Sequence, residues 1–249
     1  MTLLDDAPQV AMYAAPYGSL DLSTPPPTIS VVIPTLNEEK NIVAVLARIP
    51  EWIDEVIIVD GQSTDDTIAT ALAFMPRARI VLQKAKGKGD ALSCGFNAAT
   101  CDVIVMLDAD GSTSPDEIPR FIAALRTGAD FAKGTRFVTG GGSSDITHLR
   151  SLGNRVLTTI VNRCWGVKYT DLCYGYNAFW RRCLPALSID SSGFEVETLL
   201  NIKAARNGLN VVEVPSYEAT RTHGLSNLNA WRDGSRVLRT IFAERIRPR

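Results

Sequence analysis

The chain has 249 residues, of which 45% are hydrophobic and 21% are charged, and its formal net charge is −1. A chain of this length and composition can build one large α/β domain with a substantial core. The balanced charge gives no overall field that would mark a nucleic-acid-binding protein, so no nucleic-acid partner is expected.

The cysteine and histidine content narrows the possible metal chemistry. The five cysteines are odd in number and match no zinc spacing, and two histidines exclude a histidine-rich site. Reduced cytoplasmic thiols account for the cysteines. The apolar runs fall short of the ~20 residues that span a bilayer, and no signal-peptide pattern is visible. We therefore expect a cytoplasmic protein, soluble or peripheral at the inner face of the cell membrane.

The first half of the chain alternates between strand and helix patterns. Residues 1–27 carry several prolines and no periodic pattern, which predicts a disordered or loosely attached leader. The alternation from residue 29 predicts a mostly parallel sheet with helices on both faces. The expected strands are 29–33, 55–59, 79–82, 103–107 and 129–133, and the expected helices are 38–48, 64–74, 90–99 and one opened by Pro115.

The second half begins with a glycine-rich loop at 140–144. Nothing in it resembles an interdomain linker, so residues 28–249 are expected to form a single domain. The last helix combines an apolar stripe with six arginines in residues 230–249. This basic amphipathic helix is expected to lie on an anionic membrane surface or to pack on the core. The expected elements are helices at 149–165, 195–207 and 230–245 and strands at 176–180 and 210–214.

Two carboxylates follow the fourth strand, in Asp108-Ala109-Asp110. Ligands of open parallel sheets bind at the carboxyl ends of the strands. Mg²⁺ and Mn²⁺ prefer oxygen ligands and readily bridge to a diphosphate. Many D-x-D sequences are solvated turns, but acids that end a buried strand are costly unless they are functional. The sequence therefore predicts a Mg²⁺ or Mn²⁺ site at Asp108 and Asp110.

A basic, glycine-containing segment follows the third strand, at residues 84–89. Lys86 and Lys88 supply positive charge, and the next helix adds its N-terminal dipole, so the segment suits a diphosphate. A solvated basic turn is the alternative. Asp90 is expected to cap the helix that follows.

The ends of the first two strands complete the expected nucleotide site. Asp60 ends the second strand, where its carboxylate can accept a hydrogen bond from a base N–H, and Ser63 is expected to cap the following helix. The residues expected to line the site from the first strand are Pro34, Thr35, Asn37 and Glu38.

Four ordered segments resemble the family 2 glycosyltransferases of GT-A (Rossmann-like) fold. They are V-I-P-T-L-N-E at 32–38, V-D-G-Q-S-T-D at 59–65, G-K-G at 87–89 and L-D-A-D-G at 107–111. Within the family the chain is most similar to the polyprenyl-phosphate (dolichyl-phosphate) mannosyl- and glucosyltransferases, over residues 29–240. The resemblance implies a UDP- or GDP-sugar donor, a metal-dependent reaction and inversion at the anomeric carbon.

The resemblance also covers the second half of the chain. The segment R-T-H-G-L-S at 221–226 is similar to a family loop that folds over the donor diphosphate, which implies donor contacts for Arg221, His223 and Ser226. An acidic pair at 195–197 also matches. The residues that the resemblance assigns to the acceptor site are Arg136, Arg150, Asn154 and Glu197.

The expected acceptor is polyprenyl phosphate, and a glycan or small-molecule hydroxyl is the alternative. A phosphate acceptor is already anionic, whereas a hydroxyl needs a general base. Asp171 is the first candidate for that base, ahead of Glu197, and a hydrogen bond that braces the loop is its alternative role. Arg136 and Arg150 could likewise form ion pairs with Asp171 or Asp145.

Departures from the family pattern bear on the acceptor. The chain has Ser112, Asn177 and Asn227 where the polyprenyl-phosphate enzymes carry glutamine, arginine and lysine. A nucleotidyltransferase also uses paired acids and a basic loop, but the chain lacks the amino-terminal G-x-G-T-R signature of that class.

Overall fold

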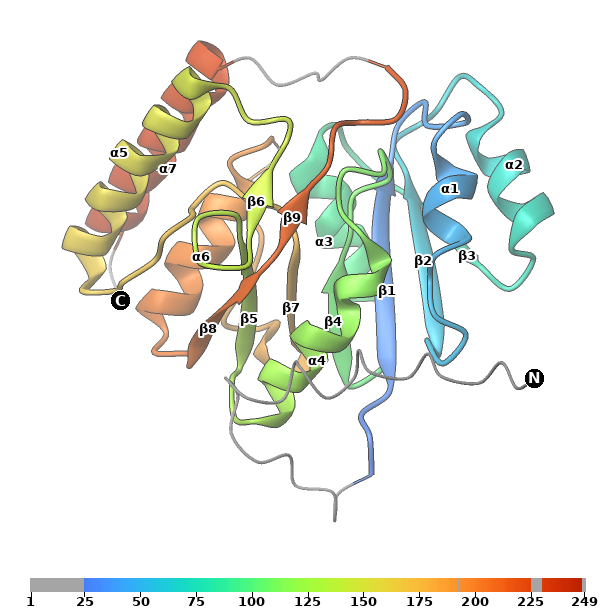
Figure 1. Ribbon diagram of the computed structural model, residues 1–249, viewed down its shortest axis with the longest axis horizontal. Coiled ribbons are helices and arrows are strands. Elements are labelled where there is room, and N and C mark those ends of the chain that lie inside the picture. Colours follow the sequence, from blue (N-terminus) through green and yellow to red (C-terminus); the bar gives the residue numbers. More distant parts are fainter. Residues whose placement is uncertain (1–24, 192, 225–229, 248–249) are drawn as a thin grey trace, which may run out of the picture.

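The computed structural model describes residues 25–191, 193–224 and 230–247. Most of the predicted leader, residues 1–24, lies outside the described residues. A seven-stranded sheet in the order β3-β2-β1-β4-β7-β5-β8 forms the centre. Helices cover both faces of this sheet, which is mostly parallel, as predicted (Figure 1).

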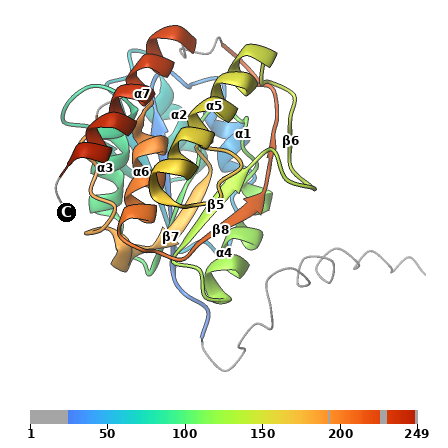
Figure 2. The ribbon, with the colours of Figure 1, turned by 90° about the vertical axis from the view of Figure 1, so that its left-hand side faces the viewer.

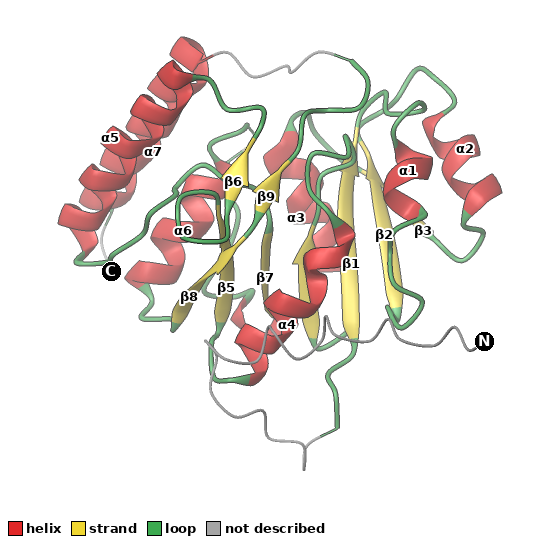
Figure 3. Cartoon of the chain, viewed as in Figure 1, coloured by secondary structure: helices red, strands yellow, loops and turns green. Residues whose placement is uncertain are grey.

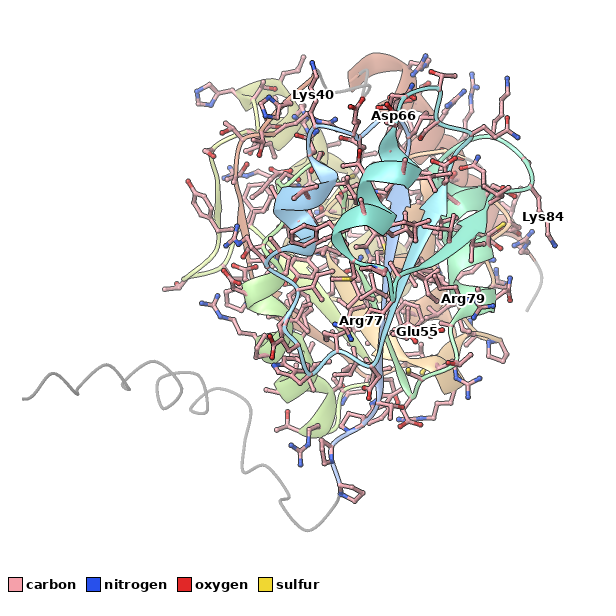
Figure 4. The ribbon with its side chains drawn as sticks, turned by 90° about the vertical axis from the view of Figure 1, so that its right-hand side faces the viewer. Lys40, Glu55, Asp66, Arg77, Arg79 and Lys84 are labelled. Carbon is pink, nitrogen blue, oxygen red and sulfur yellow. The ribbon has the colours of Figure 1, made fainter. Side chains whose placement is uncertain are left out.

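Four parallel strands build the first half of the sheet. They are β1 (Ile29–Thr35), β2 (Glu55–Asp60), β3 (Arg79–Leu82) and β4 (Val103–Met106). Because they run in one direction, their carboxyl ends share one edge, at the top in Figure 1. At the opposite edge, Arg79 and Glu55 form an ion pair of 3.4 Å between β3 and β2 (Figure 4).

The second half of the sheet contains β5 (Phe131–Thr135), β7 (Asn177–Trp180) and β8 (Val211–Pro215). Strand β7 lies antiparallel between β4 and β5. A second sheet pairs β6 (Gly142–Ser143) with β9 (Tyr217–Glu218). The sequence does not predict this small sheet, because strands of two residues are too short to show a period.

The helices form two layers and an outer pair (Figure 3). Three of them pack on one face of the sheet and two on the other. The first layer is α1 (Ile42–Leu46), α2 (Thr67–Phe74) and α4 (Ile118–Arg126), the second is α3 (Lys88–Ala98) and α6 (Val196–Arg206), and the outer pair is α5 (His148–Trp165) and α7 (Ala230–Ile246). The outer pair packs with α6 around Val161, Ile202 and Ile241.

The strands are almost continuously apolar because they are buried on both faces. Along β1, Val31 and Ile33 pack with α1 and α4, whereas Val32 packs with α3. Pro115 opens the short 3₁₀ helix η2 (Pro115–Glu117), which leads into α4, and a second 3₁₀ helix, η3 (Arg181–Cys183), follows β7. The proline costs no hydrogen bond in a first turn.

Two predicted helix caps are wrong. The Ser63 hydroxyl accepts from the backbone N–H of Asn37 (2.9 Å), and Asp65 instead accepts from the N–H of Thr67 in the first turn of α2 (3.1 Å). Asp90 lies inside the first turn of α3, and its carboxylate accepts from backbone N–H groups of the preceding basic segment. Both side chains brace loops at the carboxyl edge of the sheet rather than a helix end.

Helix α1 is much shorter than the predicted helix at 38–48. Glu38 and Asn41 precede it, and the side chain of Asn41 donates to Glu38 (2.6 Å) and to the carbonyl of His223 (3.1 Å). These tertiary contacts use residues that the periodic pattern assigned to the helix.

Candidate active site

The strand ends meet in a cluster of charged side chains centred on Asp108. Lys88, in the first turn of α3, places its ammonium 2.6 Å from Asp108 Oδ1 and 2.8 Å from Glu197 Oε1 of α6. Burial lowers the pKa of Lys88, but the carboxylates of Asp108 and Glu197 outweigh it and leave that pKa above its ordinary value. Lys88 is therefore a fixed cation beside the predicted metal-binding acid.

Gly175 approaches this cluster from the segment before β7. A Cβ added to Gly175 would lie 3.2 Å from both Asp108 Oδ2 and Lys88 Nζ, and 3.3 Å from Glu197 Oε1. A side chain at this position would crowd all three charged groups. The sequence predicted no role for Gly175, although a loop glycine between two tyrosines was a usable signal.

Asp110 takes part in a second cluster, with Arg221 and Glu38. The Arg221 guanidinium lies 2.8 Å from Asp110 Oδ2 and 3.1 Å from Glu38 Oε1. The backbone N–H of Thr222 donates to the carbonyl of Asp110 (3.3 Å). Residues 219–224 therefore cross the carboxyl edge beside the acids. The His223 side chain is exposed, and Ser226 lies outside the described residues.

Asp60 presents an unsatisfied oxygen at the same edge. The residue is 1% exposed, and its Oδ2 accepts from the backbone N–H of Ser63 (3.0 Å). Within the described part of the chain, Asp60 Oδ1 is buried with no hydrogen-bond partner. A buried carboxylate oxygen without a donor is costly. It is suited to a ligand N–H, such as that of a nucleobase.

The end of β1 and the turn that follows it form the backbone of this part of the site. Thr35 is buried, and its hydroxyl donates to the carbonyl of Val59 (3.3 Å), while Pro34 is half-buried. Asn37 adopts a left-handed conformation (φ 57°), and its side chain accepts from the N–H of Thr64 (2.8 Å). These contacts fix the turn that faces Asp60.

The lysines of the basic segment divide into two kinds. Lys84 and Lys86 are exposed, and Figure 4 shows Lys84 projecting away from the body of the protein. Lys88 instead turns inward to Asp108. The predicted diphosphate segment therefore contains one lysine held by an ion pair, Lys88, and two exposed lysines.

The donor set at the acids fits a hard divalent cation. Asp108 and Asp110 offer carboxylate oxygens, which Mg²⁺ and Mn²⁺ prefer, and Ala109 between them is buried. Among the residues that the structure describes, no group of three or more histidine, cysteine or acidic side chains could hold a metal ion. A cation at these two acids would need further oxygen ligands, and diphosphate oxygens are suitable ones.

Arg136 and Asp171 form a buried ion pair. Arg136 donates to Asp171 through Nε (2.7 Å) and Nη2 (3.0 Å), and through Nη1 to Glu218 (2.9 Å). Burial raises the pKa of Asp171, but Arg136 outweighs it and holds that pKa below its ordinary value. Asp171 is fully buried and makes the bracing contact that the sequence left as its alternative role.

The other two predicted acceptor residues lie on α5. Arg150 pairs with Asp145 at 3.0 Å and stays partly exposed. Asn154 is buried, and its side-chain oxygen accepts from the backbone N–H groups of Leu172 (3.2 Å) and Cys173 (3.0 Å). Asn154 therefore braces the chain that leads to Gly175.

Comparison with known proteins gives consistent results. Residues 30–187 match the family described as Glycosyl transferase family 2. The polyprenol monophosphomannose synthase of Mycolicibacterium smegmatis is 32% identical over 225 residues, which is 85% of this chain and 83% of that protein. The undecaprenyl-phosphate mannosyltransferase of Micrococcus luteus is 31% identical, over 84% of this chain and 91% of that protein.

A solved structure shares the architecture. Glucosyl-3-phosphoglycerate synthase of Mycobacterium tuberculosis, in complex with Mn²⁺, UDP and glucosyl-3-phosphoglycerate, superposes with a TM-score of 0.72. It is 29% identical, and the match covers 90% of this chain and 81% of that one. The fold is thus the predicted GT-A fold.

Proposed function

The chain belongs to glycosyl transferase family 2, and on that premise we propose that it moves a hexose from a UDP- or GDP-sugar to a polyprenyl phosphate. In this reaction an acceptor phosphate oxygen attacks the anomeric carbon, and the bond to the nucleoside diphosphate breaks, with inversion. The curated relatives that act on polyprenyl or undecaprenyl phosphate support this acceptor. The nucleoside diphosphate takes the electron pair of the broken bond.

The donor binds along the carboxyl edge of the sheet in this proposal. The base donates an N–H to the unsatisfied Oδ1 of Asp60, and the diphosphate lies near Lys88 and Arg221. Lys88 is held protonated by its two carboxylate partners, so it supports the negative charge that develops on the leaving group. Lys86, with its exposed side chain, adds positive charge where the donor enters this edge of the sheet.

Asp108 and Asp110 would hold Mg²⁺ or Mn²⁺, which when bound neutralises charge on the diphosphate. The Mn²⁺ in the structurally similar synthase supports a divalent metal. Arg221 forms ion pairs with both Asp110 and Glu38, so this part of the site can hold a positively charged group.

The acceptor assignment rests on Asp171, the residue that would otherwise be the general base. Both its oxygens accept from Arg136, and its pKa is low, so it is poorly suited to take a proton. An anionic phosphate needs no such base. This observation favours a phosphate nucleophile over a hydroxyl one.

Arg150 is better suited than Arg136 to meet the acceptor phosphate. Arg136 is committed to two buried carboxylates, whereas Arg150 makes one partly exposed ion pair. A partly exposed pair is worth little and exchanges readily for a phosphate. We assign Arg136 and Asn154 to positioning the segment that carries Gly175.

A small-molecule hydroxyl acceptor is the second candidate. The structurally similar synthase has glucosyl-3-phosphoglycerate bound, which supports this possibility. Glu197 would then be the base, since burial raises its pKa above the ordinary value despite the nearby Lys88. It also lies beside Gly175 and Asp108.

An acceptor screen tests the proposal. The purified protein is supplied with UDP- and GDP-hexoses, Mn²⁺ or Mg²⁺, and undecaprenyl phosphate, 3-phosphoglycerate or a free sugar. We expect transfer to undecaprenyl phosphate. Glu197→Gln should leave the pH profile of this transfer unchanged, because a phosphate acceptor needs no general base. Inactivity on the lipid, together with activity on a hydroxyl acceptor that Glu197→Gln abolishes, would establish the second candidate instead.

A lipid acceptor places the reaction at a membrane. No helix among the described residues is long and apolar enough to cross a bilayer. We propose that the protein works from the cytoplasm as a peripheral protein at the inner face of the cell membrane.

A further inference from the structure

Helix α5 presents an apolar surface to solvent. Leu149, Leu152 and Val156 are 54%, 62% and 53% exposed, and their spacing of three and four residues places them on one face of the helix. The opposite face, which includes Val161, packs with α6 and α7. These three residues, called the α5 stripe, therefore lie outside the core, and a contiguous exposed apolar stripe is typical of an interaction surface.

The charges on α5 are of one sign. The helix contains three arginines and no acidic residue. Arg155 and Arg163 are exposed. By helical geometry Arg155 flanks the α5 stripe, and Arg163 continues its line two turns beyond Val156. Apolar side chains bordered by arginines match the acyl chains and phosphates of an anionic bilayer.

The α5 stripe lies at the functional end of the molecule. Helices α5 and α7 lie side by side, and both begin at the edge where β1 and β4 end (Figures 1 and 2). The stripe occupies the first three turns of α5, close to that edge. A membrane seated on it would lie at the same end of the molecule as Asp108 and Asp110.

The predicted membrane surface of α7 is less suited to dock on a bilayer than the α5 stripe. Of the apolar stripe predicted there, Leu238 is half-buried, and the side chain of Trp231 lies outside the described part of the structure. The neighbouring Val237 and Ile241 are buried in the cluster with α5 and α6. Phe242 and Ile246 are 59% and 83% exposed, but they lie at the far end of the helix from the acids. A bilayer on these two residues would hold the acceptor away from the site.

We propose that the α5 stripe docks the protein on an anionic bilayer, with its three side chains among the acyl chains and Arg155 and Arg163 at lipid phosphates. The inference deepens the proposed function and rests on it, because docking at the start of α5 brings the acceptor's phosphate to the catalytic edge.

Vesicle flotation tests the docking without requiring turnover. The full chain is compared with the triple variant Leu149→Ser, Leu152→Ser, Val156→Ser, on phosphatidylcholine vesicles with and without phosphatidylglycerol. We expect the triple variant to lower the partition coefficient by about tenfold or more. The control variant, Phe242→Ser with Ile246→Ser, removes two apolar side chains of α7 that are at least as exposed as most of the stripe, and it should bind as the wild type does.

The arginines are tested separately. Arg155→Gln with Arg163→Gln should weaken binding to phosphatidylglycerol vesicles by about tenfold, since each arginine near an anionic surface contributes to attraction, and should leave the weaker binding to phosphatidylcholine unchanged. Equal losses on both vesicles would contradict the electrostatic part of the proposal.

Two further measurements separate docking from catalysis and from self-association. With a short, water-soluble prenyl phosphate and no vesicles, the triple variant should transfer sugar at the wild-type rate. A wild type that floats through the α5 stripe but uses no prenyl phosphate would overturn the proposed function alone. Flotation of the triple variant at the wild-type level would overturn docking alone. A dimer by sedimentation that the triple variant dissociates, with flotation unchanged, would assign the stripe to a contact between copies.

Discussion

At the scale of single residues, the site depends on carboxylates whose partners differ. Asp108 and Asp110 each face a cation from another element, and Asp60 keeps one oxygen without a partner in the described structure. Asp171 is saturated by Arg136. Sequence position alone does not distinguish these four acids, since all follow or precede strands, but their partners assign them different chemistry.

Replacing either acid of the D-A-D segment should abolish transfer without unfolding the protein. In Asp108→Asn and Asp110→Asn, the loss of a charged oxygen ligand should remove metal-dependent donor binding, measured by calorimetry with Mn²⁺ and the nucleotide sugar. Asp66→Asn, which changes an exposed acid of a neighbouring loop, serves as the control and should bind normally. Normal turnover by either site variant would refute the metal site.

Gly175 should tolerate no side chain. Gly175→Ala places a methyl group 3.2 Å from Asp108 Oδ2 and Lys88 Nζ, so these charged groups must shift, and we expect kcat to fall by about tenfold or more, the effect of misplacing catalytic groups. The melting temperature should change little.

A glycine in α5 provides the matched control. A Cβ added to Gly153 meets nothing within 4 Å, so Gly153→Ala should keep full activity. It should also stabilise the protein by about 0.5–1 kcal/mol, the usual gain in a helix interior. Equal activity of the two alanine variants would show that the approach of Gly175 to the acids is unimportant.

At the scale of elements, buried ion pairs join segments that the sequence keeps far apart. Arg136, just after β5, holds the loop at Asp171 and also Glu218 of β9, while Ser143 of β6 donates to the same Glu218 (2.5 Å). The small sheet is thereby tied to the main one, next to the start of α5.

Removing the arginine of this network should be costly. Arg136→Ala leaves Asp171 buried and unpaired, so we expect the free energy of unfolding to fall by about 3–5 kcal/mol. Chemical denaturation measures this change. Adding Asp171→Asn to the variant should restore part of the loss, because it removes the uncompensated charge. If Arg136→Ala alone is as stable as the wild type, Asp171 must gain another partner or be reached by water in that variant.

The first strand should not need the preceding leader. Ile29 begins β1, and Thr28 is tied to Asp102 through its N–H (3.1 Å) and hydroxyl (2.8 Å). A chain that starts at Pro26 keeps these contacts, so its kcat and melting temperature should equal those of the full chain. A large loss in either, measured by assay and calorimetry, would mean that the leader contributes to the domain.

At the scale of the whole molecule, buried acid–base pairs make stability depend on pH. The pKa of Asp171 in the folded protein lies below its ordinary value of 3.8 because Arg136 outweighs the effect of burial. A carboxyl whose pKa is lowered by folding stabilises the protein above its unfolded pKa, and the contribution disappears as the pH falls through the folded value.

The pH dependence can be attributed to one residue by subtraction. We expect Asp171→Asn to reduce the free energy of unfolding more at pH 7 than near pH 3, which lies below the ordinary pKa of the carboxyl, so that the carboxyl is largely protonated in the unfolded chain. Urea denaturation at several pH values gives this difference, and other titrating groups cancel in it. A loss that stays constant over this range would mean that the pKa of Asp171 is not lowered by folding.

The sequence by itself determined the strands of the main sheet and the edge at which the charged residues gather. Apolar runs bounded by turns predicted every strand of the main sheet, and the rule that strand ends converge brought Asp60, Lys88 and Asp108 to one edge. These inferences succeed because periodicity and strand direction are local properties of the chain.

The tertiary structure alone decided how the charged side chains pair. The fold decides that Arg136 pairs with Asp171, which the sequence left as one of two alternatives. It alone brings Arg221 to Asp110 and Gly175 to Lys88. It also separates the exposed stripe of α5 from the partly buried side of α7, two helices whose sequences are similarly amphipathic. Pairing and burial depend on residues distant in sequence, and a local pattern carries no information about which distant group arrives.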